Sequence, residues 1–189
     1  MGMLQLLKGL PGKPSHPPLT DASIGAYTAA VAMLVAGALG LETAQMAHGA
    51  LLALSVGLLL AAPTATTGLL DWLDLPKGSP ARATATLHLF TMVGATVLFA
   101  LTWLAQRSGY VDGEITTLGL ILGIVAEVVL AAGGTIGGSL AYVYGVRVIK
   151  RADVAVAEAV IPGRLPPAAP ADRPTDIPVD TGMRKEPRL

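Results

Sequence analysis

The chain has 189 residues, of which 52% are hydrophobic and 14% charged, and its mean hydropathy is +0.61. A soluble domain usually carries about 25% charged residues, so this composition excludes a water-facing surface and indicates a membrane protein. The net charge of +0 gives no basis for nucleic acid as a partner, and the absence of cysteine excludes disulfides, thiolate zinc sites and a self-held iron–sulfur cluster.

Four long apolar runs follow one another along the chain, at residues 22–41, 45–70, 83–105 and 115–146. Each is long enough to cross about 30 Å of hydrocarbon as a helix. Only helices or closed barrels span lipid, and these runs lack the alternation of barrel strands. The sequence therefore predicts an all-α integral membrane bundle of four transmembrane helices.

The segments outside these runs divide the chain into three expected parts. Residues 1–21 are expected to be an N-terminal cytoplasmic segment, and residues 22–148 the four-helix transmembrane domain. Residues 149–189 contain many prolines and few large apolar groups, so we expect a mostly disordered cytoplasmic tail. No internal repeat is evident.

The basic residues predict the orientation, because lysine and arginine gather on the cytoplasmic side of a membrane. A single residue, Arg107, lies on the side predicted to face outward. Those on the other side are Lys8, Lys13, Lys77, Arg82, Arg147, Lys150 and Arg151. We therefore expect both termini in the cytoplasm and a multi-pass protein of the bacterial inner (plasma) membrane.

A stripe of small residues follows the fourth span at steps of three and four, and Glu127 belongs to it. Small residues let transmembrane helices approach closely, so this stripe is expected to face the other helices. Its glycines are Gly119, Gly123, Gly134, Gly138 and Gly145.

Five ionisable residues form a candidate proton relay or polar site: Glu127, His88, His16, Asp21 and Asp71. Glu127 near mid-membrane is a functional candidate by default, and the alternative is a neutral acid hydrogen-bonded to a neighbouring helix. His88, on the inward face of the third span, is either a relay or ligand or an interhelical hydrogen-bond donor.

The other three candidates belong with His88 at the cytoplasmic interface. Two histidines and two carboxylates suit a metal ion. We prefer structural roles and predict no metal site: Asp21 as the N-cap of the first helix, and Asp71 as a partner of Arg82.

Four stretches together carry a family resemblance, at residues 15–21, 67–72, 87–88 and 137–146. In their order and spacing they resemble the domain of unknown function 2231 (DUF2231) family of bacterial membrane proteins, over about residues 14–148. The resemblance implies a four-helix membrane protein with no established activity. It also implies an association with redox proteins, because some relatives carry a Rieske-type domain. Many relatives have histidine where Asp21 and Tyr144 stand here, whereas His16 and His88 are retained.

The function expected from these observations is a non-enzymatic accessory or anchoring subunit of a membrane complex, such as a respiratory or redox complex. Its expected partners are the lipid bilayer and other membrane subunits, including a Rieske-type redox partner. One alternative is a small transporter or proton-relay protein that uses Glu127 and His88, and another is a b-type cytochrome.

No cofactor is expected, because a bis-histidine haem needs two imidazoles on one iron. The spans that carry His48 and His88 enter the membrane from opposite sides, and each histidine lies near the start of its span. The two histidines should therefore lie at different depths. His16 approaches His88 only if the proline-containing segment before residue 22 folds back into the bundle.

Overall fold

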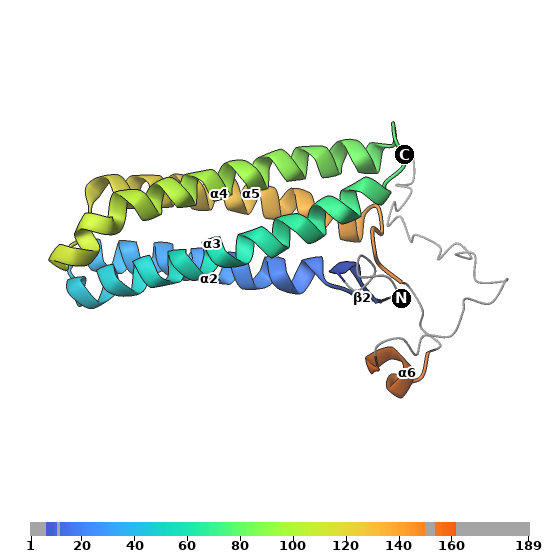
Figure 1. The fold of residues 1–189 in the computed structure, drawn as a ribbon, viewed down its shortest axis with the longest axis horizontal. Helices are drawn as coiled ribbons and strands as arrows, with labels where there is room; N and C mark the ends of the chain where they lie inside the picture. The colour runs from blue at the N-terminus through green and yellow to red at the C-terminus, as the bar shows by residue number, and fades with distance from the viewer. Residues whose placement is uncertain (1–6, 11, 150–153, 162–189) are drawn as a thin grey trace, which may run out of the picture.

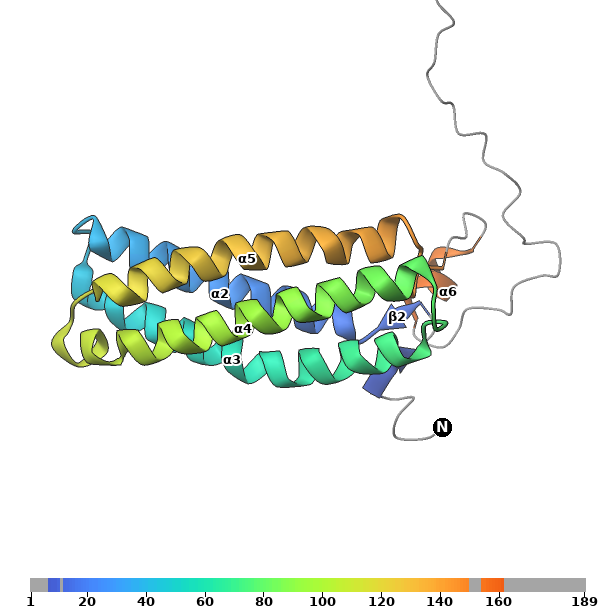
Figure 2. The same cartoon turned by 90° about the horizontal axis from the view of Figure 1, so that it is seen from above.

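The computed structural model describes residues 7–10, 12–149 and 154–161. Four antiparallel helices form an elongated bundle, α2 (His16–Ala38), α3 (Thr43–Asp74), α4 (Pro80–Asp112) and α5 (Thr117–Tyr142) (Figures 1 and 2). A hairpin of β1 (Gly9–Leu10) and β2 (Lys13–Pro14) precedes them, and α6 (Val156–Val160) follows. All four long helices are long and apolar enough to cross a membrane, which confirms the predicted all-α membrane bundle.

The first helix begins at His16, not at Ala22 as the sequence suggested. Pro17 and Pro18 occupy the first turn, where a helix needs no N–H donor and where the fixed φ of proline suits the helix. Ser15 is the N-cap residue, so the expectation for Asp21 is wrong: Asp21 lies inside α2 on an exposed face. This earlier start brings His16 into the helix.

The other boundaries differ from the apolar runs at both ends of the bundle. α3 and α4 have 32 and 33 residues and are therefore about 48 Å long, well beyond a hydrocarbon core of about 30 Å. α5 ends at Tyr142, so Gly145 lies outside it in a turn with φ +64°. Most of the expected tail, 149–189, lies outside the described residues.

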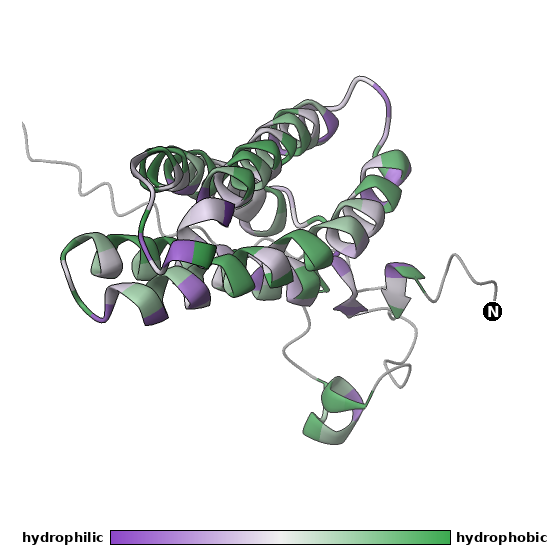
Figure 3. Ribbon diagram, turned by 60° about the vertical axis from the view of Figure 1, so that its left-hand side comes forward, coloured by the Kyte–Doolittle hydropathy of each residue, from purple (hydrophilic) through white to green (hydrophobic). Residues whose placement is uncertain are grey.

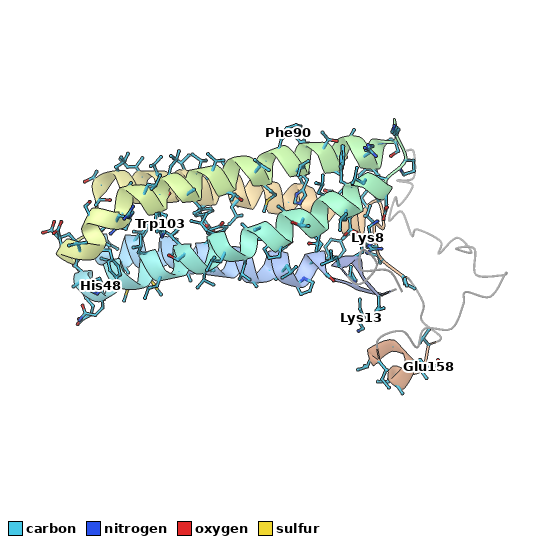
Figure 4. All side chains as sticks on the ribbon, in the orientation of Figure 1. Lys8, Lys13, His48, Phe90, Trp103 and Glu158 are labelled. Carbon is cyan, nitrogen blue, oxygen red and sulfur yellow. The ribbon has the colours of Figure 1, made fainter. Side chains whose placement is uncertain are left out.

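The centre of the bundle holds an aromatic pair from two different helices. The rings of Tyr27 and Phe99 stack with their centroids 4.0 Å apart and their planes at 2°, and both side chains are buried. Large apolar side chains also cover the outside, and Phe90 points away from the bundle (Figure 4). Hydrophobic residues follow the bodies of the helices, and hydrophilic ones gather toward the ends (Figure 3). An apolar outer face is what lipid-exposed helices require.

The contacting face of α5 departs from the predicted stripe in its second half. The glycines in close contact are Gly119, Gly123, Gly133 and Gly137. The predicted Gly134 instead borders open space, since a Cβ there would meet no atom within 4 Å, and a Cβ on Gly138 would meet only the Tyr142 ring at 3.9 Å. Residues spaced alternately three and four apart stay on one helix face. Each further spacing of four instead moves the residue around the helix axis by about 40°.

The predicted orientation can be tested with single cysteines, because the chain has none. We expect Cys in place of Pro76, in the exposed turn between α3 and α4, to be shielded from an impermeant thiol reagent in intact cells. Cys in place of Ser108, near the exposed end of α4, should react under the same conditions. Labelling at residue 76 but not at residue 108 would reverse the orientation.

Candidate functional site

A cavity of about 680 Å³ lies between the α2–α3 hairpin and the α4–α5 hairpin. All four long helices line it, toward the end where α2 and α4 begin. α2 contributes His16, Pro17, Thr20, Asp21 and Ile24, and α4 contributes His88, Leu89, Met92, Val93 and Thr96. The two sets have the same spacing from their histidine, although His16 is the first residue of α2 and His88 lies about two turns inside α4. The other lining residues of these helices, Ser23, Tyr27, Ala85 and Val97, do not follow this spacing.

Each hairpin holds one histidine by the same two contacts. His16 Nδ1 lies 3.0 Å from the carbonyl oxygen of Thr64, and its ring packs where Gly68 leaves room for it. His88 Nδ1 lies 2.9 Å from the carbonyl oxygen of Gly133, and its ring packs in the same way on Gly137. The carbonyl and the glycine are one helical turn apart in both cases.

This similarity makes the two hairpins a structural repeat that the sequence did not reveal. The interval from His16 to Tyr27 equals the interval from His88 to Phe99, and the two aromatic rings stack on each other. Because both hairpins run in the same direction, the repeat is of the parallel type that is related by an axis along the membrane normal. The histidine pair and the aromatic pair both contain one member from each hairpin.

The two histidine rings lie close together across the hairpins. Their centroids are 6.5 Å apart and their planes make an angle of 82°. A carbonyl oxygen only accepts hydrogen bonds, so each Nδ1 carries a proton, and in the neutral form of each ring the lone pair lies on Nε2. In the part of the chain that the structure describes, Nε2 of His16 has only a 3.5 Å contact with Thr20 Oγ1, and Nε2 of His88 has no hydrogen bond.

Charged side chains border the cavity at the end where α2 begins. Asp71 pairs with Arg147, with Asp71 Oδ1 3.0 Å from Nε. The expected pairing of Asp71 with Arg82 is wrong, because Arg82 lies over the Trp72 ring at 4.0 Å and donates to the carbonyl of Leu75. Asp21 lines the cavity but makes no hydrogen bond or ion pair with any residue that the structure describes.

Glu127 lies at a different level of the bundle. Thr28 Oγ1 donates to its Oε1 at 2.8 Å, and its Oε2 is buried without a hydrogen-bond partner among the described residues. His88 bonds the carbonyl of Gly133, which marks the level of His88 on α5. Glu127 and Gly133 are about 9 Å apart along this helix. The structure therefore does not join Glu127 and His88 into one relay.

The family of the chain follows from a comparison of its sequence with those of known families. The profile of DUF2231, described as a predicted membrane protein, matches residues 12–150. The chain belongs to the DUF2231 family. No curated protein and no solved structure matches this DUF2231 protein.

The candidate residues of this DUF2231 protein therefore fall into separate groups. The structure brings His16, His88 and Asp71 to one cavity, with Asp21 at its edge, and places Glu127 elsewhere. Within 7–10, 12–149 and 154–161, no three His, Asp or Glu side chains converge to bind a metal ion by protein ligands alone. Sequence reasoning missed Gly68, Gly133 and Gly137, which make room for the two histidine rings or bind them.

Two neutral imidazoles with anchored Nδ1 groups suit an iron with two open axial positions. The hydrogen bond at Nδ1 fixes the tautomer and the ring orientation, as second-shell partners of metal-binding histidines do. The cavity volume lies within the range of about 300–1,000 Å³ that is usual for small-molecule and cofactor sites.

Proposed function

We propose that this DUF2231 protein is a b-type cytochrome whose haem iron takes His16 and His88 as axial ligands. The observation that carries the proposal is the pair of anchored imidazoles, with ring centroids 6.5 Å apart. Two imidazoles on one iron have nitrogens about 4 Å apart and ring centres about 6 Å apart, from metal–nitrogen distances of about 2 Å.

The location of the pair also supports a haem site. Cofactor sites in four-helix bundles are built from side chains on facing helices, and here α2 and α4 each supply one histidine to a cavity between the hairpins. The earlier expectation of no cofactor depended on His16 lying outside the bundle. Its place in the first turn of α2 removes that premise.

Haem in such a site supplies one-electron transfer, and its protein needs partners that reduce and oxidise it. The proposed role is therefore an electron-carrying accessory subunit of a redox complex in the bacterial inner membrane, and a Rieske-type protein remains a proposed partner. A proton relay through Glu127 and His88 has less support, because the two side chains lie at different levels.

The test is the visible spectrum of the full chain after expression in a host that makes haem b. We expect about one haem per chain and a low-spin spectrum whose Soret band shifts on reduction with dithionite. Because the ring planes make an angle of 82°, the oxidised protein should give the highly anisotropic low-spin electron paramagnetic resonance signal of perpendicular axial imidazoles.

Three alanine variants locate the ligands. His16→Ala and His88→Ala should each lose the low-spin spectrum. His48→Ala is the matched control, because His48 lies at the opposite end of the bundle from Lys8, beside the Tyr110 ring at 4.8 Å (Figure 4). A colourless wild-type protein from haem-replete cells, or a low-spin spectrum that persists in His16→Ala, would refute the assignment.

A further inference from the structure

The guanidinium of Arg147 borders the cavity at its polar end. Of the cavity-lining residues that the structure describes, Arg147 is the one with a permanent positive charge. It follows a reversal of the chain after α5, in which Gly145 and Arg147 have φ +64° and +60° and the N–H of Val146 donates to the carbonyl of Leu140 at 2.8 Å. The reversal directs the guanidinium back over the end of the cavity.

The ion pair between Arg147 and Asp71 leaves hydrogen-bonding capacity unused. Asp71 Oδ1 lies 3.0 Å from Nε, yet this oxygen is buried and accepts no hydrogen bond from any described residue, because the N–H does not point at it. Nη2 of Arg147 donates to the carbonyl of Lys8 at 2.5 Å. A guanidinium has five N–H donors, so donors remain for another anion.

The two ends of the cavity differ in polarity. Asp71 and Arg147 lie at one end, whereas Tyr27, Leu58 and Leu130 line it deeper in the bundle. A ligand with acidic groups on one edge and an apolar opposite edge fits this gradient. Haem b is such a ligand, since its two carboxylate side chains share one edge of the porphyrin.

We propose that Arg147 binds the carboxylate side chains of the haem and that Asp71 competes with them for the same guanidinium. This inference rests on the proposed function and deepens it, because it fixes which way the porphyrin faces. A carboxylate at the edge of a low-dielectric cavity needs a charged partner, and arginine matches the geometry of a carboxylate. The acidic edge then faces the end of the bundle where α2 begins, which we expect to be cytoplasmic.

The experiment compares haem b with its dimethyl ester, which keeps the iron and the ring but has no acidic groups. The full chain is purified in detergent after growth under haem limitation and titrated with each porphyrin. Wild type should bind the free acid about tenfold more tightly or better, the ratio that one hydrogen bond to a charged group provides. Arg147→Gln should bind the two forms equally, with its affinity for the ester unchanged.

Two further variants test the same contact if Arg147→Gln does not fold. Arg147→Lys keeps the charge and should keep part of the preference, and Asp71→Asn removes the competing anion and should strengthen binding of the free acid. An unchanged preference in Arg147→Gln, with a bis-histidine spectrum present, overturns the role of Arg147 alone. Failure of wild type to form a bis-histidine spectrum with either porphyrin overturns the haem assignment as well.

Discussion

Leucine in place of Gly134 is expected to weaken haem binding by up to about a hundredfold while the bundle stays folded. Gly134 lines the cavity, and a Cβ there would meet no atom within 4 Å. The new side chain therefore projects into the cavity rather than into a neighbouring helix. Overfilling a packed site by a few methylene groups costs about 1–3 kcal/mol, which corresponds to about a hundredfold in affinity at the upper end.

The matched control for this variant is Gly94→Leu. Gly94 also borders open space but does not line the cavity, so both variants make the same chemical change in a long helix. Haem titration followed at the Soret band measures the affinity, and gel filtration in detergent measures folding. Equal affinities in the two variants would place the haem outside this cavity. Aggregation of Gly134→Leu alone would instead support the tight helix contact that the sequence suggested.

The largest stability effect is expected at the other end of the bundle, in Gln106→Leu. The side chain of Gln106 is 0% exposed. Its Nε2 donates to the carbonyl of Glu114 at 2.8 Å, and its Oε1 accepts from the backbone N–H of Thr116 at 3.1 Å. Leucine fills similar space but leaves both backbone groups without a partner, so we expect a loss of about 2–3 kcal/mol in the free energy of unfolding.

The control for this substitution is Gln45→Leu, at the same end of the bundle. Gln45 lies on an exposed face of α3, so its replacement by leucine should change the free energy of unfolding by less than about 0.5 kcal/mol. Unfolding by a denaturing detergent in mixed micelles compares the variants. A loss in Gln106→Leu no larger than in Gln45→Leu would mean that water satisfies the α4–α5 turn.

The fold was predictable because each span is a local property of the sequence. An uncharged run of about 20 residues crosses a bilayer whatever its neighbours are, and the runs at residues 22–41 and 83–105 lie inside α2 and α4 for most of their length. The helix ends were less predictable. At the start of α2, the prolines indicate a break, and only the position of Ser15 as N-cap shows that they begin the helix.

The repeat escaped sequence reasoning because few positions carry it. The two hairpins share a histidine that bonds a carbonyl on the second helix and packs on a glycine, and an aromatic residue at a fixed interval after that histidine. Lipid-facing positions accept almost any apolar residue and retain no similarity. Alignment of His16 with His88, which also aligns Tyr27 with Phe99, was the one available signal.

The sequence by itself determined that the chain crosses the membrane four times and that His88 lies on the inward face of its helix, because hydropathy and helical periodicity depend on neighbouring residues alone. The partner of that histidine was decided by tertiary structure. His16 and His88 come from different hairpins, and their 6.5 Å separation results from the packing of α2 on α3, of α4 on α5 and of one hairpin on the other. The same packing leaves Gly134 beside a cavity rather than in a helix contact, because a small rotation of α5 is set by its neighbours and not by its own sequence.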